Sequence, residues 1–447
     1  MNQKVHLIAI GGSIMHNLAL ALHSQGFIVS GSDDQIYEPA RSRLGKRGIC
    51  PEKEGWWPEN INNDLSFVIL GMHAKGNNPE LLRALELGLK VYSFPEFVAE
   101  YYKDSHRIVL AGSHGKTTTT SMLMHVFKEL NLSFDYLVGA QIEGFDEMVS
   151  LHKAEYALIE GDEYLSSCLD PRPKIMHYSP QIAIITGIAW DHYNVFPKFE
   201  LYTKAFADFI SSMPASGTLF WYQGDDDLQK IVSMYGKHIH CIPYGEPEYV
   251  IQNEKCYLIS EEACYPLEVI GKHNLQNMNS VLKVCHLLGF NSLSVCEALS
   301  SFKGAAKRMQ LLKKNDTLTI YQDFAHAPSK VKATINALKE TFPGKTLTCF
   351  LELHTYSSLN NNFLPQYADT CNKCDKLTVY YDKKALEIKN MENLDPEFVA
   401  SCFNIENIDI IHEGEILKEK IAEAQAADGI LVFLGSGNWN GNKLYQE

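Results

Sequence analysis

The sequence predicts an α/β protein of three domains with mostly parallel sheets. Its 447 residues suffice for about three domains at roughly 150 residues each. Short runs of β-forming residues alternate with amphipathic segments, a pattern typical of parallel sheets with helical crossovers. A polar stretch at 101–107 interrupts this alternation, and a second change of pattern follows Arg308. We therefore expect domains at 1–104, 105–309 and 310–447.

Each domain is predicted from its own succession of elements. In the first we expect strands at 5–10, 27–30, 67–70 and 90–92 and helices at 15–24 and 80–87. In the second we expect strands at 108–111, 156–159 and 182–186, helices starting at Lys116 and at 200–213, a β-rich patch (217–222, 238–244, 256–259) and a helix at 274–288. In the third, a hairpin of 310–313 and 318–321 precedes strands at 347–351, 376–381 and 429–434 and helices at 328–341 and 416–425.

Composition narrows the classes of protein that remain. Hydrophobic residues make up 45% and charged residues 21%, as in an ordinary globular protein. The net charge of -14, from 54 acidic and 40 basic residues, argues against a nucleic-acid binder. No run approaches the roughly 20 apolar residues that cross a bilayer, so no membrane partner is expected. The apolar start ends in Gly11-Gly12 rather than in a cleavage site, and the 11 cysteines suit a reducing compartment, so we expect a cytoplasmic protein.

The sharpest motif is a phosphate-binding loop that spans Gly112 to Thr118. A predicted strand runs into Gly-Ser-His-Gly-Lys-Thr-Thr, and a helix follows. This arrangement directs backbone N–H groups and the positive end of a helix dipole at one point, where a polyphosphate can bind. Lys116 would reach the β- and γ-phosphates, and the Thr117 hydroxyl would bind Mg²⁺. Leu110 stands where the strict motif has its first glycine, so the loop is a shortened variant.

Mg²⁺ requires further oxygen ligands, and two acidic clusters follow strands of the same domain. Glu160, Asp162 and Glu163 follow the strand at 156–159, and Asp191-His192 follows the strand at 182–186. Because ligands of open α/β sheets bind beyond the carboxyl ends of the strands, both clusters are expected to face the loop.

A second glycine turn, Gly11-Gly12, lies between the first strand and the first helix. Ser32-Asp33 follows the next strand and could bind a ribose hydroxyl. This weak dinucleotide pattern keeps a nicotinamide-dependent dehydrogenase as an alternative, and a non-catalytic nucleotide switch is another.

Two later pairs of polar residues could either bind a ligand or simply begin a helix. Asn274 and Asn277 lie three residues apart and share a helix face, where amides can pair with an adenine edge, but Asn274 could equally be a helix N-cap. Asp323 and His326 follow a strand and precede a helix, which is also the composition of a plain helix-entry turn.

Together these motifs resemble the Mur ligase family, the ATP-dependent amide-forming enzymes of peptidoglycan synthesis. The resemblance covers nearly the whole chain and rests on the loop at 112–118, Glu160, Asp191-His192, His273-Asn274-x-x-Asn277, Lys307-Arg308 and Asp323-x-x-His326-x-Pro328. It implies a Rossmann-like UDP-binding first domain, a central P-loop ATPase domain and a Rossmann-like C-terminal domain that binds the amine.

The resemblance also implies a role for each motif residue, with ATP and Mg²⁺ as cofactors. Lys116, Glu160 and His192 would be catalytic, and Thr117, Glu160 and His192 would hold the metal. ATP would be bound by Gly112, Ser113, His114, Gly115, Lys116, Thr117, Thr118, Asn274, Asn277, Arg308 and Asp323. UDP-N-acetylmuramate would be bound by Gly11, Gly12, Ser32 and Asp33.

The identity of the amine separates two members of this branch. One adds L-alanine, and the other adds the tripeptide L-alanyl-γ-D-glutamyl-meso-diaminopimelate during peptidoglycan recycling. Tyr164 and the segment Lys174-x-x-His177-Tyr178-x-Pro180 resemble the tripeptide enzyme. The L-alanine enzymes carry a second histidine where this chain has Ala327 and an arginine where it has Thr355. We expect the tripeptide, with L-alanine as the alternative, and place His326, His354, Gly435 and Ser436 on the amine side. The sequence leaves the oligomeric state open.

Overall fold

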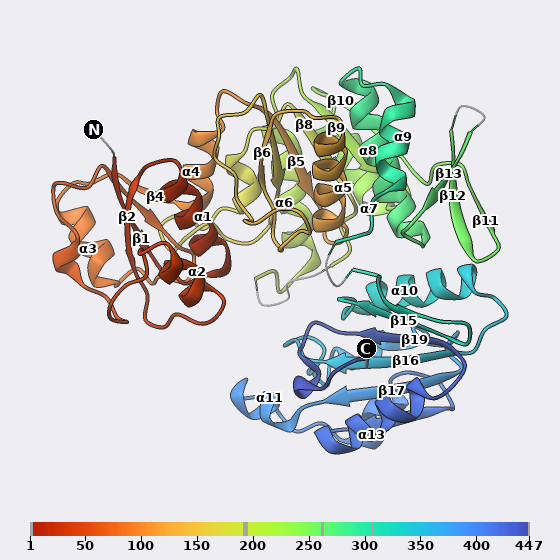
Figure 1. Ribbon diagram of the computed structural model, residues 1–447. Helices are drawn as coiled ribbons and strands as arrows, with labels where there is room; N and C mark the ends of the chain where they lie inside the picture. Colours follow the sequence, from red (N-terminus) through yellow and green to blue (C-terminus); the bar gives the residue numbers. More distant parts are fainter. Residues whose placement is uncertain (1–2, 191–194, 261–262, 306–307, 446–447) are drawn as a thin grey trace. The chain divides into compact units, whose positions relative to one another are not determined.

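The computed structural model describes residues 3–190, 195–260, 263–305 and 308–445 (Figure 1). Its contacts divide the chain into two compact units. One unit contains the chain up to Gly245 together with Ser280–Val295, and the other contains Glu246–Asn279 and the chain from Cys296 onward. Within the described residues no helix is both long enough and apolar enough to span a membrane.

The first unit begins with a four-stranded parallel sheet in the order β2-β1-β3-β4. Its elements are β1 (Lys4–Ile8), α1 (Ser13–Ser24), β2 (Ile28–Ser32), α2 (Ala40–Lys46), η1 (Pro58–Asn60), β3 (Phe67–Leu70), α3 (Pro79–Glu86), β4 (Val91–Ser93) and α4 (Phe94–Tyr101). The strand order reverses at β1, because β2 lies on one side of it and β3 and β4 on the other. The carboxyl end of β1 is therefore at a topological switch point, where ligands of such sheets bind.

A six-stranded sheet follows in the same unit, in the order β10-β9-β8-β5-β7-β6, and all its pairings are parallel. Its elements are β5 (His106–Ala111), α5 (Lys116–Glu129), β6 (Phe134–Leu137), β7 (Tyr156–Glu160), η2 (Lys174–His177), β8 (Ile182–Ile185), α6 (Phe199–Ser212), β9 (Thr218–Tyr222), α7 (Asp226–Tyr235) and β10 (His240–Tyr244). Here the order reverses at β5, so the loop that follows β5 lies at the second switch point.

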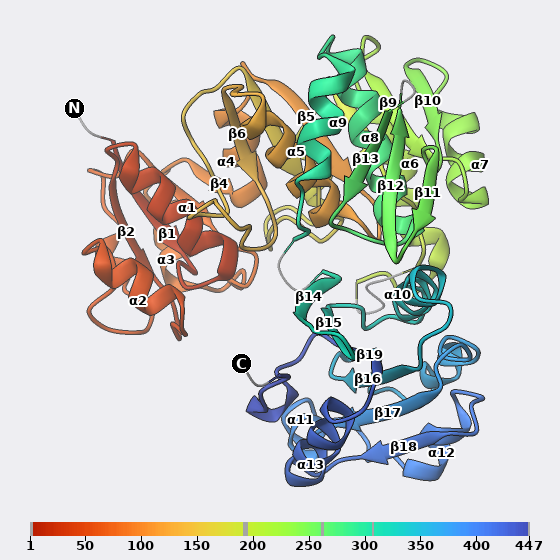
Figure 2. The ribbon, with the colours of Figure 1, turned by 45° about the vertical axis from the view of Figure 1, so that its right-hand side comes forward.

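The predicted β-rich patch is divided between two sheets. Strands β9 and β10 extend the central parallel sheet, whereas β12 (Lys255–Ser260) lies between β11 (Tyr249–Gln252) and β13 (Ala263–Leu267) in a separate antiparallel sheet (Figure 2). Helices α8 (Lys272–Leu287) and α9 (Ser292–Ser300) follow.

The C-terminal sheet of the second unit has six strands in the order β14-β15-β19-β16-β17-β18. The predicted hairpin forms the antiparallel pair β14–β15, and the other pairings are parallel. The elements are β14 (Gln310–Lys314), β15 (Leu318–Asp323), α10 (Pro328–Thr341), β16 (Leu347–Leu353), η3 (Leu364–Tyr367), β17 (Lys376–Tyr381), α11 (Lys383–Ile388), α12 (Pro396–Ser401), β18 (Ile408–Ile411), α13 (Gly414–Gln425), β19 (Gly429–Leu434) and η4 (Trp439–Gly441). The α/β class that the sequence predicts is confirmed.

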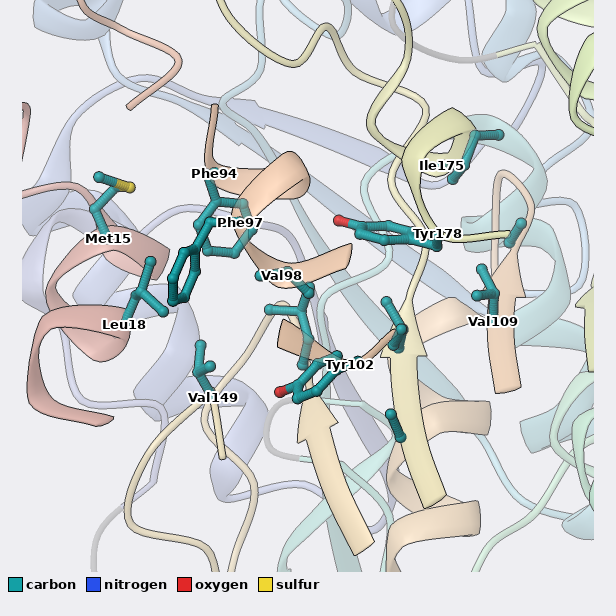
Figure 3. Close-up of a cluster of buried hydrophobic side chains, with 14 of the residues drawn as sticks. Met15, Leu18, Phe94, Phe97, Val98, Tyr102, Val109, Val149, Ile175 and Tyr178 are labelled. Atoms are coloured by element: carbon teal, nitrogen blue, oxygen red, sulfur yellow. The ribbon is translucent and has the colours of Figure 1, made fainter. Parts of the chain in front are cut away.

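One hydrophobic cluster runs through both sheets of the first unit. Helix α4 supplies Phe94, Phe97 and Val98, which lie near Met15 and Leu18 of α1 (Figure 3). The same cluster includes residues of the central sheet and its loops, among them Val109, Val149, Ile175 and Tyr178. The N-terminal and central sheets therefore share a core.

Candidate active site

The loop between β5 and α5 has the backbone of an anion site. Gly112 has φ of 126° and Gly115 has φ of 82°, both in the region that favours glycine. Gly115 caps α5 without a side chain, and the first turn of the helix carries no acidic residue. The N–H groups at the start of α5 are therefore not capped by a side chain, and the helix dipole favours a negative group there.

The end of strand β8 fixes the shape of this loop. The Ser113 N–H donates to the Gly187 carbonyl at 2.9 Å, and the Thr186 hydroxyl donates to the carbonyls of Ala111, at 3.2 Å, and of His114. A Cβ atom on Gly112 would lie 2.4 Å from the Thr186 hydroxyl oxygen. Because the loop after β5 packs this closely against the residues that follow β8, position 112 requires glycine.

Lys116 is surrounded by carboxylates. Its Nζ donates to Glu163 Oε2 at 2.7 Å and to the Gly112 carbonyl at 2.5 Å. Burial lowers the pKa of Lys116, but the negative charges of Glu163, Asp162 and Glu160 outweigh it, so the pKa is raised above its usual value. Lys116 therefore stays protonated at neutral pH, and its ammonium lies beside the loop at the start of α5.

Thr117 and Glu160 form the second polar pair of the site. The Thr117 hydroxyl donates to Glu160 Oε1 at 2.8 Å, and the Gly139 N–H donates to Glu160 Oε2 at 2.7 Å. Burial raises the pKa of Glu160, and the Gly139 N–H and Lys116 oppose that shift. Hydroxyl and carboxylate oxygens are the ligands that Mg²⁺ prefers, so these two residues fit that ion. Asp191 and His192 lie outside the described residues.

The first glycine turn lies beyond β1 and contacts Asp33. The Gly11 N–H donates to Asp33 Oδ2 at 2.7 Å, while Ala9 has φ of 68°, unusual for a residue other than glycine. Burial raises the pKa of Asp33 to about 6, against the opposing effect of the Gly11 N–H. Ser32 is fully buried and its Oγ has no hydrogen-bond partner. The turn thus brings Gly11, Gly12, Ser32 and Asp33 to one sheet edge.

In the second unit, Asn274 and Asn277 lie in the first turns of α8 and are both buried. The Asn274 side-chain amide donates to the Ile270 carbonyl at 2.8 Å, so it already fixes the entry to the helix. Burial lowers the pKa of the neighbouring His273, and Asp323 opposes that shift. Asn277 remains the candidate for contact with a base.

The remaining predicted residues belong to the C-terminal part of the second unit. Asp323 ends β15 and accepts a 2.5 Å hydrogen bond from the Thr334 hydroxyl. The guanidinium of Arg308 lies over the ring of Phe324, 4.6 Å from its centroid. His326 Nδ1 is 2.8 Å from the Phe324 carbonyl oxygen, and burial lowers the pKa of His354. Lys307 lies outside the described residues.

Gly435 and Ser436 follow strand β19. Gly435 lies close to the buried carboxylate of Glu352, a residue that the sequence analysis did not identify. A Cβ atom on Gly435 would lie 2.8 Å from that of Glu352, and one on Gly437 would lie 2.3 Å from Glu352 Oε1. Glu352 itself is 3% exposed and accepts a hydrogen bond from the Trp439 N–H at 3.1 Å. Glu352 directly follows the strand predicted at 347–351 and lies within the observed strand β16, so an acidic residue at the predicted strand end was the available sequence signal.

Tyr202 on α6 is the second residue that sequence reasoning missed. Its hydroxyl donates to Glu163 Oε1 at 3.0 Å and is 2.7 Å from Ser113 Oγ. A buried tyrosine in an amphipathic helix is ordinarily a core residue, so the sequence contained no signal that distinguishes it.

Comparison with known proteins identifies the family. Three family models match the chain: "Mur ligase family, catalytic domain" at residues 4–106, "Mur ligase middle domain" at 110–285 and "Mur ligase, glutamate ligase domain" at 307–437.

Two relatives differ in the amine that their names specify. The UDP-N-acetylmuramate–L-alanine ligase of Caldicellulosiruptor bescii is 30% identical over 98% of this chain and 96% of its own length. The UDP-N-acetylmuramate–L-alanyl-γ-D-glutamyl-meso-2,6-diaminoheptandioate ligase of Haemophilus influenzae is 25% identical over 98% of this chain and 97% of its own.

A solved structure shows the same three-domain fold. The UDP-N-acetylmuramate–alanine ligase of Thermotoga maritima superposes with a TM-score of 0.70 and covers 98% of this chain and 97% of its own, at 20% identity. The prediction of a three-domain α/β protein is thereby confirmed. The chain belongs to the Mur ligase family, the ATP-dependent ligases of peptidoglycan synthesis.

Proposed function

We propose that this enzyme joins UDP-N-acetylmuramate to the tripeptide L-alanyl-γ-D-glutamyl-meso-diaminopimelate, with ATP as the energy source. The observation that carries the ATP site is the loop after β5, where the Lys116 ammonium and the Thr117–Glu160 pair lie at the start of α5. A nicotinamide-dependent dehydrogenase would not require this arrangement.

The proposed chemistry follows from the poor reactivity of a carboxylate. A carboxylate is a poor acyl donor because oxide would have to leave. Transfer of the γ-phosphoryl group of ATP to the muramyl carboxylate gives an acyl phosphate and ADP. The α-amine of the tripeptide then attacks the acyl carbon through a tetrahedral intermediate, and phosphate leaves. In such phosphoryl transfers the protein mainly supplies position and countercharge.

The residues of the candidate site can supply both the positioning and the countercharge that phosphoryl transfer requires. The N–H groups at 113–116 and the Lys116 ammonium would bind the phosphates, and Asn277, Arg308 and Asp323 would contact the rest of the nucleotide. Thr117, Glu160 and His192 would hold Mg²⁺, which neutralises charge on the phosphates. Gly11, Gly12, Ser32 and Asp33 would bind the UDP-sugar, and His326, His354, Gly435 and Ser436 would line the amine side.

Residues near the loop support the tripeptide as the amine. Lys174 donates to Asp162 Oδ2 at 2.7 Å, and its Nζ lies 5.9 Å from the centroid of the Tyr164 ring. Two features that resemble the tripeptide enzymes, Tyr164 and Lys174, are thus adjacent to the acidic end of β7. The alternative, L-alanine, is supported by the 30% identity to an L-alanine ligase.

An amine panel tests the proposal. The purified chain is incubated with UDP-N-acetylmuramate, MgATP and either the tripeptide or L-alanine, while ADP release is followed and the UDP product is identified by mass spectrometry. We expect a much higher kcat/KM for the tripeptide. A higher kcat/KM for L-alanine would reassign the enzyme to the biosynthetic reaction.

A further inference from the structure

Glu163 and Tyr202 connect two positions of the phosphate loop from outside it. Glu163 is fully buried, and its two oxygens accept hydrogen bonds from Lys116 Nζ at 2.7 Å and from the Tyr202 hydroxyl at 3.0 Å. Because Tyr202 donates its single hydroxyl proton to Glu163, its oxygen accepts from Ser113 Oγ at 2.7 Å. The path Ser113–Tyr202–Glu163–Lys116 therefore begins and ends on the loop.

The ring of Tyr202 is held rigidly. Tyr202 is itself fully buried, and its ring makes edge-to-face contacts with Phe196 and Phe206, each at 5.2 Å between centroids. Lys204, two residues further along α6, is directed elsewhere: its side chain is 65% exposed and pairs with Asp208. Of these two side chains, α6 thus presents Tyr202 to the loop.

A carboxylate beside Lys116 has a specific consequence for phosphoryl transfer. The lysine has a flexible four-carbon stem, so its ammonium needs a fixed partner to occupy one position. Glu163 supplies that partner as a charge-assisted hydrogen bond, which is among the stronger kinds. Small displacements of a group that aligns reactants reduce the rate of the chemical step more than they reduce ground-state binding.

We propose that Glu163 and Tyr202 are positioning residues, with Glu163 acting on Lys116 and Tyr202 acting on Lys116 through Glu163. The inference rests on the proposed role of the loop as the ATP site. Neither residue needs to touch the substrate; both orient the groups that do.

The variants Tyr202→Phe and Glu163→Gln test this role, singly and combined. Tyr202→Phe removes both hydrogen bonds of the hydroxyl, and Glu163→Gln removes the charge of the carboxylate, each with little change in the shape of the side chain. We expect each single variant to lower kcat for ADP release about tenfold, the effect of one lost hydrogen bond to a charged group. The KM for ATP should change much less than kcat. Because both variants break the same path, the double variant should be no slower than the slower single variant.

Tyr102→Phe is the matched control. Tyr102 is also fully buried, and its hydroxyl donates to the Ser150 carbonyl at 2.5 Å, with the Tyr136 carbonyl oxygen 3.2 Å away. It should retain the wild-type kcat, and thermal unfolding of every variant identifies losses that are due to instability. If Glu163→Gln does not fold, Tyr202→Phe alone decides.

Two results would overturn the inference: a wild-type kcat for Tyr202→Phe, or effects of the two substitutions that multiply in the double variant. All assays use whichever amine the wild-type enzyme accepts. A preference for L-alanine would therefore contradict the proposed substrate while the kcat comparison still decides the positioning role.

Discussion

Lys116 is the residue on which the proposed chemistry depends most directly. Its ammonium lies among three acidic side chains, which keep it charged. We predict that Lys116→Ala abolishes ADP release and leaves UDP-N-acetylmuramate binding largely intact. The physical reason is that Gly11 and Asp33 follow strands β1 and β2 of the N-terminal sheet, whereas Lys116 follows a strand of the central sheet. Calorimetric titration with the UDP-sugar and an ADP-release assay measure the two effects, and an equal loss of both would contradict this division of labour.

The raised pKa of Asp33 predicts that the stability of the folded protein depends on pH. Burial raises its pKa to about 6 in the folded protein, compared with 3.8 for an ordinary aspartate. The folded protein therefore retains this proton over a pH range in which the unfolded chain loses it, so Asp33 reduces stability as pH rises from about 4 to about 6.

Asp33→Asn keeps an acceptor for the Gly11 N–H but cannot ionise. Its free energy of unfolding should equal that of the wild type near pH 3, where Asp33 is protonated in both the folded and the unfolded protein, and exceed it by about 1 kcal/mol at pH 7.5, after a reduction for partial solvent screening. Urea unfolding of the two proteins at both pH values measures the difference. A difference that does not vary with pH would show that ionisation of Asp33 is not its cause.

At the scale of elements, the β5–α5 connection depends on the contact between Gly112 and strand β8. An added Cβ there would meet the Thr186 hydroxyl oxygen at 2.4 Å and the Gly187 carbonyl oxygen at 2.9 Å. Gly289 is a matched control, because it also has positive φ, 78°, but nothing lies within 4 Å of an added Cβ.

We predict that Gly289→Ala costs about 1–2 kcal/mol of unfolding free energy, the penalty for a left-handed alanine. Gly112→Ala should cost about 1–3 kcal/mol more, because strand β8 must move. It should also weaken ADP binding, whereas Gly289→Ala should not. Chemical denaturation and calorimetric titration with ADP test both statements, and equal destabilisation by the two substitutions would refute the steric argument.

The buried strands could be predicted from the sequence because their apolar runs are short, nearly continuous and bounded by polar residues or glycine. Strand β1 ends at Ile8, two residues earlier than expected, because Ala9 adopts positive φ. Helix α4 was not predicted: it begins directly after the three-residue strand β4, and Pro95 near its start suggests a turn. Its start is nevertheless encoded, by the reciprocal capping hydrogen bonds of Ser93 and Glu96.

The candidate site was predictable where one continuous segment forms it and unpredictable where distant segments meet. The loop at 112–118 carries its own signal. In contrast, the pairing of Lys116 with Glu163 joins residues 47 positions apart. Glu163 follows the end of β7, where the period-two alternation of a strand no longer determines the direction of a side chain. The sequence therefore indicated an acidic cluster but not which member contacts the lysine.

For the whole molecule, the hydrophobic clusters group the sheets differently from the three domains that the sequence motifs predict. The motifs mark three domains, but the N-terminal and central sheets share one hydrophobic cluster through α4, whereas the C-terminal sheet has a cluster of its own. Elements that share a core tend to lose their structure together. We therefore expect the first two sheets to be coupled in stability although each carries a separate binding loop.

Phe97 tests that coupling, because it is buried in the shared cluster and its ring stacks on Phe67 with 5.6 Å between centroids. Phe97→Ala should cost about 3–5 kcal/mol. Amide hydrogen exchange followed by mass spectrometry should show that β1 and β5 both lose protection, while β16 retains it. Leu417→Ala, in the core of the C-terminal sheet, should have the reciprocal effect. Loss of protection in β1 alone would mean that α4 stabilises only the N-terminal sheet, and that the shared cluster does not couple the two.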